Sequence, residues 1–391
     1  MRVSGRETAG RLHEPHGIGF PLLIAPALAV GGAVAVEGWL AAIAALAFVI
    51  AAILARRLVP EPWATGGVVL VALSPPVLAY SAGVYPELAA GALVAFAALC
   101  ALELRDSMRL RFAYSGALAL ALAPWLDAEF TIVSLPVAVM LVRWTSRTRR
   151  RVATFGVAEI MLASLAVYVT VNERLFGGFT PSAAELPGQA APGAGFPREL
   201  LERLAALGLD RDYGLLRWAP ILALGFLAAW LLWRSRRERL ARLIPARRDV
   251  EGAAGLLLAV CGAQILVAAL STPSVFGAWF PGRHLIAVLP CAAALTAWGL
   301  RHAPRAGAVL GTLTLGASVW LSIALRTGAE EGWVTPDSSA PWGPAERLLP
   351  LYRTDSAWAD AVTAGVLVAF VLLLIREWRV WRAPPGLTGP A

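Results

Sequence analysis

Long apolar stretches recur through the chain, and they constrain its fold more than any other feature of the sequence. A run of about 17 to 25 apolar residues has the length of a helix that crosses a membrane. Eleven such stretches can be marked, at 38–57, 64–84, 86–104, 112–127, 129–143, 152–172, 215–233, 252–271, 284–300, 306–325 and 357–375. The sequence therefore predicts an all-α, polytopic transmembrane helix bundle that forms a single domain over residues 1–391.

Composition and local sequence refine this prediction. Charged residues make up 15% of the chain, against about 25% in an average soluble domain. The stretches 112–127 and 129–143 are short and contain Pro124 and Pro136, so we expect broken helices or one re-entrant pair. Residues 18–36 are interrupted by several prolines and glycines, which favours an interfacial or re-entrant helix over a twelfth span.

The distribution of arginine indicates how the chain is oriented. The chain contains no lysine, and its arginine-rich connections alternate strictly with arginine-poor ones. The rich set holds 22 of the 34 arginines and comprises residues 56–57, 105–111, 143–151, 234–248, 301–305 and 376–382. In plasma-membrane proteins, arginine-rich loops stay in the cytoplasm. The last arginine-rich segment adjoins the C-terminus, so we predict a plasma-membrane protein with a cytoplasmic C-terminus. The net charge of +8 then reflects topology, and we expect no nucleic-acid partner, since aromatic stacking residues and a soluble domain are missing.

Polar side chains gather at the opposite end of the predicted helices. Two long outer loops are expected there, at 173–214 and 326–356. Five groupings near the outer helix ends contain Tyr80, Tyr85 and Glu87; Asp127 and Glu129; Arg174; Arg211, Asp212 and Arg217; and Arg283 and His284. Each residue taken alone could be an ordinary polar helix end. That explanation fits the whole set less well, because a charge at the centre of a span costs about 2.5–3.5 kcal/mol. Pairing of opposite charges across the bundle would compensate this cost.

These groupings predict a polar, outward-facing cavity that contains both carboxylates and guanidinium groups. Arginine recognises phosphate through a planar, permanently charged fork. A carboxylate can act as a general base on an acceptor hydroxyl group, and a cationic side chain can stabilise the charge on a departing phosphate. The pattern therefore fits a donor that is linked to a lipid through phosphate.

Five segments follow one another over about residues 11 to 300: "EPHGIGFPLLIAPALAVGG", "LSPPVLAYSAGVYPEL", "PWLDAEF", "DRDYGLLRWAPILAL" and "FGAWFPGRHLIAVLP". Their order and spacing resemble the multi-spanning GT-C-type glycosyltransferases of actinobacteria, relatives of the polyprenyl-phosphate-dependent arabinosyl- and mannosyltransferases. The resemblance implies that a sugar is transferred from a polyprenyl-phosphate donor on the outer face, usually with inversion. It also implies a juxtamembrane helix at the place of residues 18–36.

The chain departs from that family at its start. There, a first span and an outer loop with the catalytic Asp or Glu precede the segment that matches "EPHGIGFPLL", whereas about ten residues precede it here. Three explanations stay open: a truncated or misassigned start, which we favour; a spanning segment at 18–36; or a degenerate, non-catalytic member. Glu14, flanked by His13 and His16, is a fallback candidate for the missing base, and the three also read as a solvated tail.

The function that the sequence favours is an outward-facing hexosyl- or pentosyltransferase with a polyprenyl-phosphate sugar donor, a glycan or lipid acceptor, and the lipid bilayer as its environment. The candidate catalytic residues are Glu14, Asp127 and Glu87, and the candidate substrate-binding residues are Arg283, His284, Asp212, Arg211, Arg217, Arg174, Tyr85 and Glu129. No metal ligands are indicated, and a divalent cation stays open. Two alternatives remain: a transporter or flippase for a lipid-linked sugar, and a non-catalytic envelope-assembly protein.

Overall fold

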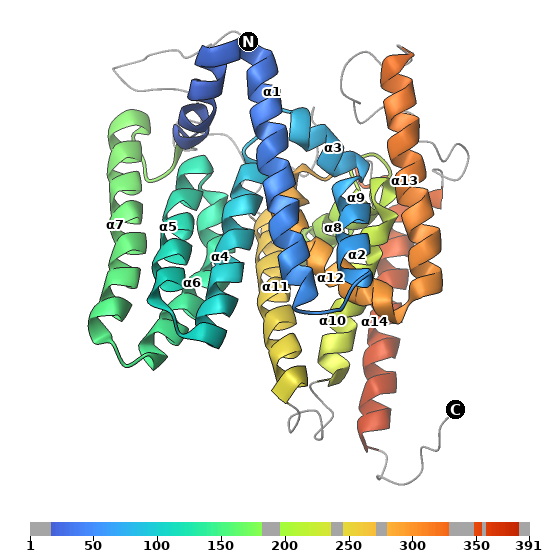
Figure 1. Ribbon diagram of the computed structural model, residues 1–391. Coiled ribbons are helices and arrows are strands. Elements are labelled where there is room, and N and C mark those ends of the chain that lie inside the picture. The colour runs from blue at the N-terminus through green and yellow to red at the C-terminus, as the bar shows by residue number, and fades with distance from the viewer. Residues whose placement is uncertain are drawn as a thin grey trace.

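The fold is all-α in the part of the chain that the computed structural model describes, which is residues 17–181, 196–235, 245–270, 280–327, 348–353 and 357–382. No strand is present within these ranges, and the helices pack side by side as a bundle (Figure 1). The helices are α1 (Gly19–Arg56), α2 (Trp63–Ala72), α3 (Pro75–Ala82), α4 (Glu87–Ser107), α5 (Leu110–Leu126), α6 (Glu129–Arg147), α7 (Arg151–Phe176), α8 (Phe196–Leu209), α9 (Leu215–Trp218), η2 (Pro220–Leu222), α10 (Ala223–Ser235), α11 (Pro245–Leu270), η4 (Arg283–Val288), α12 (Leu289–His302), α13 (Pro304–Arg326) and α14 (Ala357–Arg382).

Eight helical segments among the described residues are long and apolar enough to cross a membrane. They are α1, α4, α6, α7, residues 249–270 of α11, η4 together with α12, α13, and residues 357–376 of α14. The pair α2–α3 would make a ninth, but its halves are bent by 61°. The remaining two expected spans, α5 and η2–α10, are apolar but shorter. All eleven apolar stretches are therefore helical, while eleven crossings would require three bent or short elements to span.

The first helix differs from the prediction in the place where it breaks. A helix over 18–36 was expected to end before a separate span at 38–57, yet α1 runs from Gly19 to Arg56 and leaves helical geometry only at Gly31 and Gly32. Gly32 has a φ of 63°, which glycine adopts without the steric cost that a side chain brings. Figure 1 shows the first limb beside the end of α5 and the second limb running along the bundle.

Burial divides the helices into a centre and a periphery. In α4, 78% of the residues of the apolar window are buried, and in η4–α12 the share is 83%, against 17% in α7 and 6% in α14. Alanine dominates the buried positions of α4, and small side chains let helix backbones approach closely in a membrane setting. The bundle is therefore built around α4 and α12, and the outward side chains of α7 and α14 are apolar, as helices in contact with lipid require.

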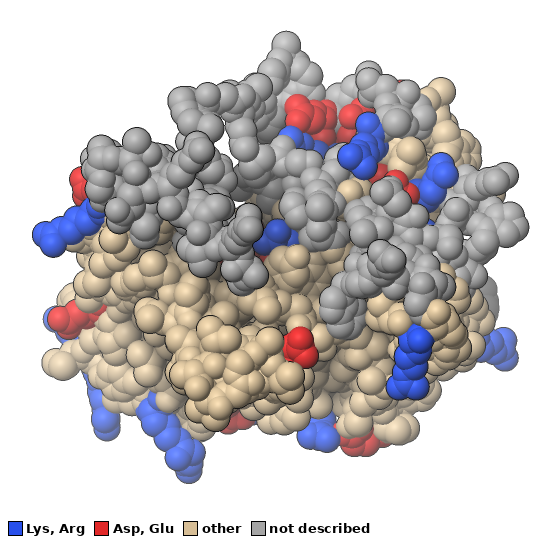
Figure 2. All heavy atoms as spheres, turned by 90° about the horizontal axis from the view of Figure 1, so that it is seen from above, with Lys and Arg blue, Asp and Glu red and all other residues tan. Residues whose placement is uncertain are grey.

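The two ends of the bundle differ in their connections. Figure 1 shows the turns α1–α2, α4–α5, α6–α7 and α12–α13 at the same end, together with the last turn of α14, so the described arginine-rich connections share one end. Viewed from the other end, much of the described surface is neither basic nor acidic (Figure 2). The segment expected as the outer loop 173–214 is not simply a loop, because it contains α8. Which side of a membrane each end faces stays a prediction.

Glycines fix the closest contacts between the central helices. A Cβ atom at Gly67 of α2 would lie 2.5 Å from the Ala297 Cα of α12, and one at Gly299 would lie 2.2 Å from the Leu224 carbonyl oxygen of α10. Both distances are shorter than the contacts that Cβ atoms make in proteins. The atoms that they would meet belong to the backbone of the neighbouring helix, which cannot shift without displacing that helix. The contacts of α12 with α2 and α10 therefore depend on the absence of a side chain.

We expect Gly67→Ala to lower the thermal unfolding temperature of the purified protein in detergent, because overpacking costs about 1–3 kcal/mol. Gly66→Ala is the matched control, since a Cβ at Gly66 meets nothing within 4 Å. That control should leave stability unchanged or raise it, because alanine favours a helix interior over glycine by about 1 kcal/mol. Equal unfolding temperatures for the two variants would contradict the close contact between α2 and α12.

Candidate functional site

A buried ion pair joins the beginnings of the two most buried elements. The Arg283 Nε atom donates to Glu87 Oε1 at 2.7 Å, and the exposed fractions of the two side chains are 22% and 5%. Glu87 is the first residue of α4, where the positive end of the helix dipole favours a carboxylate. Its second oxygen, Oε2, is buried and accepts no hydrogen bond from a described residue. Two predicted site residues thus meet, and their charges compensate each other.

Aromatic side chains hold the Arg283 guanidinium group in place. The Tyr85 ring lies under it, with the Arg283 Cζ atom 5.0 Å from the ring centroid, which is cation–π geometry. Tyr80 packs against Tyr85 with ring centroids 5.1 Å apart and donates from its hydroxyl group to the Phe280 carbonyl oxygen at 2.7 Å. This bond fixes the chain three residues before Arg283, so α3 positions the segment that carries the arginine.

Two further carboxyl groups lie beside this pair, at the turn between α5 and α6. Asp127 Oδ1 accepts a hydrogen bond from the Glu129 backbone N–H at 3.2 Å, so Asp127 caps the start of α6 in the manner of an N-cap residue. Glu129 lies within electrostatic range of Asp127, Glu87 and Arg283, and Glu87 lies within range of Asp127. Asp127 and Glu129 are both half-buried. The structure therefore brings together four charged residues that the sequence placed in three separate groupings.

Gln264 of α11 completes this group, and the sequence reasoning missed it. Its side chain is 1% exposed, its Nε2 atom donates to the His284 carbonyl oxygen at 2.7 Å, and its amide lies beside the Glu129 carboxyl group. The sequence contained a signal, because Gln264 is the one polar residue within residues 252–270 of the apolar run. A neutral amide carries no charge, and charge in an apolar context is what marked the other site residues in the sequence.

The residues around α9 form a second group that serves mainly to hold its own backbone. Asp210 Oδ1 accepts from the backbone N–H groups of Asp212 and Tyr213, each at 2.8 Å. The Arg217 side chain is buried, lies 3.6 Å from Asp212 Oδ1, and donates to the Arg211 carbonyl oxygen. Arg217 therefore stabilises the turn before α9, and Asp210, which was not among the predicted site residues, organises that turn.

The second group adjoins the first through apolar contacts. The Trp218 and Phe280 rings are 5.2 Å apart, and a Cβ at Gly282 would lie 2.6 Å from Leu215 Cδ1. The same turn also binds the segment 348–353, because the Tyr352 N–H donates to Asp210 Oδ2 at 2.8 Å. The backbone that precedes Arg283 is thus packed against α9.

Two predicted residues do not join either group. Arg174 is exposed near the end of α7, where nothing in the described residues ties it to Arg283. Glu14, with His13 and His16, lies outside the described residues. The first described residues after that segment pack against the end of α5. Added Cβ atoms at Gly19 and Gly17 would lie 2.3 and 3.1 Å from the Trp125 carbonyl oxygen.

This arrangement suits the binding of hydroxyl groups and of one phosphate. Three carboxyl groups and a buried amide can accept from or donate to sugar hydroxyls, and arginine carries five N–H donors in one plane, so Arg283 can hold Glu87 and still reach an anion. Among the described residues, no three of His, Cys, Asp and Glu are grouped so that they could hold a metal ion. No protein-family model matches the chain, and no curated protein matches it.

We expect Arg283→Gln to destabilise the protein markedly, since removing one partner of a buried ion pair costs about 3–5 kcal/mol. The double variant Glu87→Gln/Arg283→Gln should recover part of that loss, because no uncompensated charge is left buried. Thermal unfolding in detergent measures both effects. Arg326→Gln, at an exposed position at the end of α13, is the control and should change stability little; a double variant no more stable than Arg283→Gln would show that the two charges are not coupled.

Proposed function

We propose that the protein is a polytopic plasma-membrane glycosyltransferase of the GT-C type, which transfers a sugar from a polyprenyl-phosphate-linked donor to a cell-envelope acceptor. The observation that carries the proposal is the Glu87–Arg283 pair with the Asp127 and Glu129 carboxyl groups beside it. A half-buried cation among several carboxylates supplies the two chemistries that this reaction needs. They are recognition of a phosphate and acceptance of a proton from a hydroxyl group.

An apolar groove supports a donor with a long hydrocarbon chain. A cavity of about 760 Å³ lies between α6 and α11 and is lined mainly by aliphatic side chains. Its lining includes Ile132, one turn from Glu129, and Ala263, which precedes Gln264. The groove and the polar group therefore share two helices. An isoprenoid chain in this groove would have its phosphate end near the polar group.

The residues then divide the reaction between them. Arg283 would bind the donor phosphate and stabilise the charge on the departing polyprenyl phosphate. Asp127 would remove the proton from the acceptor hydroxyl as that oxygen attacks the anomeric carbon, and the carbon–oxygen bond to the phosphate would break. We favour Asp127 over Glu87 as the base because Asp127 is half-buried and can be reached by an acceptor, whereas the Glu87 side chain is 5% exposed. Glu129 and Gln264 would orient sugar hydroxyl groups.

The proposed topology places this polar group at the outer face. The arginine-rich turns lie at the other end of the bundle (Figure 1), and arginine-rich connections remain in the cytoplasm. With the bent α2–α3 pair, α5 and η2–α10 counted as crossings, the chain crosses eleven times, and the C-terminus is cytoplasmic. Accessibility of cysteines introduced at each end to a membrane-impermeant reagent tests this arrangement.

Turnover by the full-length protein in proteoliposomes tests the proposed reaction. We expect release of a labelled sugar from a polyprenyl-phosphate donor, and a fall of about 10²–10³ in kcat/KM for Arg283→Gln, as for the loss of one charge-stabilising donor. Asp127→Asn should abolish turnover while donor binding persists. Arg326→Gln is the matched arginine control and should retain activity.

The alternative class is a transporter of lipid-linked sugars. The observation that favours it is the pair of broken elements, at Gly31–Gly32 in α1 and between α2 and α3, because interrupted helices are typical of transporter binding sites. Movement of the labelled lipid between leaflets without cleavage of its sugar–phosphate bond would show that the protein is a transporter and would contradict the proposed transferase activity. Donor binding without cleavage or movement would favour a non-catalytic assembly role.

A further inference from the structure

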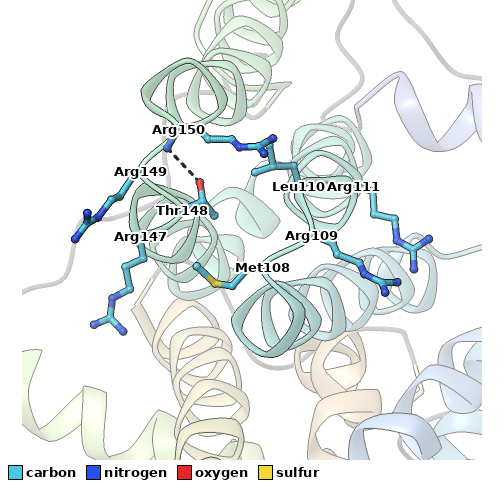
Figure 3. Close-up of a pocket in the computed structure, with 8 residues that line it drawn as sticks. All are labelled: Met108, Arg109, Leu110, Arg111, Arg147, Thr148, Arg149 and Arg150. Carbon is cyan, nitrogen blue, oxygen red and sulfur yellow. Dashed lines mark hydrogen bonds between the residues drawn. The ribbon is translucent and has the colours of Figure 1, made fainter.

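A basic pocket lies at the end of the bundle opposite the Glu87–Arg283 pair. It has a volume of about 660 Å³ and is lined by Met108, Leu110 and Thr148 together with five arginines, Arg109, Arg111, Arg147, Arg149 and Arg150. The lining residues come from two connections, α4–α5 and α6–α7 (Figure 3). Figure 3 shows the Arg150 side chain reaching towards Leu110 across the pocket, and the other arginine side chains pointing outward around it.

The charge of this pocket is not neutralised by acidic side chains. Some arginines at this end are paired with carboxylates: Arg56 with Glu61 at 2.6 Å, and Arg57 with Asp106 and Glu103. Within the described ranges, none of the five pocket arginines forms an ion pair with a carboxylate. Arg111 and Arg147 instead lie over aromatic rings of their own helices, with Cζ-to-centroid distances of 4.7 and 4.2 Å. A site with this excess of positive charge attracts an anion.

The backbone at the pocket is unusual as well. Met108 and Arg149 have φ values of 54° and 59°, and they are the two non-glycine residues with positive φ in the described part of the chain. Each sits at the turn of one connection. Side chains disfavour this conformation, and where it persists it often marks a functional turn. Met108 is the C-cap of α4 and bonds the Leu104 carbonyl oxygen, so its conformation ends that helix and sets where the α4–α5 connection enters the pocket.

The pocket also lies at the level where the apolar surface of the bundle begins. Val152 and Phe155, in the first turns of α7, are 85% and 73% exposed, and Val152 follows Arg150 by two residues. Large apolar side chains with such exposure are expected to face acyl chains. The arginines therefore stand at headgroup depth, which distinguishes a lipid phosphate from a phosphate in free solution.

We propose that this pocket binds the headgroup of an anionic phospholipid from the leaflet at the arginine-rich end. The headgroup phosphate would lie beside Arg150, which reaches across the pocket (Figure 3). Arg109 and Arg149 are exposed and would turn towards it from their outward positions, with the acyl chains along the exposed side chains of α7. Arginine suits this role because its planar fork binds phosphate oxygens in pairs, and basic pockets at helix ends recognise acidic headgroups. The site is separate from the proposed donor site and does not depend on it.

Native mass spectrometry of the detergent-solubilised, full-length protein tests the proposal. Added phosphatidylglycerol should be retained in preference to phosphatidylcholine. Arg109→Gln/Arg150→Gln should weaken that retention about 30-fold, because two basic groups leave the anion site. Arg301→Gln/Arg305→Gln removes the same charge from the α12–α13 connection and should retain the lipid. Arg109→Lys/Arg150→Lys, which keeps the charge, should lose less than the glutamine variant.

Two results would overturn the proposal. Equal loss in both glutamine variants would show a general attraction of charge and no specific pocket. Displacement of phosphatidylglycerol by an equal concentration of inorganic phosphate would show that the pocket binds free phosphate, with no contribution from the lipid. Thermal unfolding of each variant in lipid-free detergent distinguishes loss of the site from loss of the fold.

Discussion

The buried Glu87 carboxylate at the start of α4 requires a cation. This requirement organises the end of the bundle opposite the arginine-rich connections. Arg283 supplies this cation from the start of η4–α12, so the two most buried helical elements are joined by charge where they begin, and Gly91 of α4 lies against the Ala287 backbone of η4 nearby. The Tyr80 bond to Phe280 and the Gln264 bond to the His284 carbonyl oxygen both position the backbone around that arginine. Removal of the cation would leave the buried Glu87 carboxylate without compensation.

The fold was largely predictable because its signal is additive along the chain. Each apolar stretch was long enough to identify alone, and every one is helical in the structure. The positions of breaks were less predictable. The bend between α2 and α3 was not expected. The break in the first helix was expected between residues 36 and 38, whereas it lies at Gly31 and Gly32. Helix α8 was missed because its amphipathic sequence lies in a region that reads as an outer loop.

The site was predictable as a set of charged residues and unpredictable as a geometry. Glu87, Asp127, Glu129 and Arg283 stood out because each interrupts apolar sequence, and they do lie together. Arg217 stood out in the same way, yet its side chain is used to hold the turn beside Asp212. Charge in an apolar context indicates that a partner exists, but it does not say whether that partner is a ligand or the protein's own backbone. Neutral Gln264 gave no charge signal at all, although it contacts the same group.

The break in α1 has a mechanical consequence. The first limb is fixed at Gly19 against Trp125 of α5, and the second limb packs its buried residues against the centre of the bundle. Gly31 and Gly32 between them are the softest backbone of the helix, since glycine has the fewest steric restrictions. A displacement of the α5–α6 turn, which carries Asp127, would therefore rotate the first limb about this joint and leave the second limb in place. The first limb also places Phe20 in one buried cluster with Ala89 of α4 and Ala287 of η4. A movement of that turn would therefore reach the helices that hold Glu87 and Arg283 through the first limb, while the second limb stays in place.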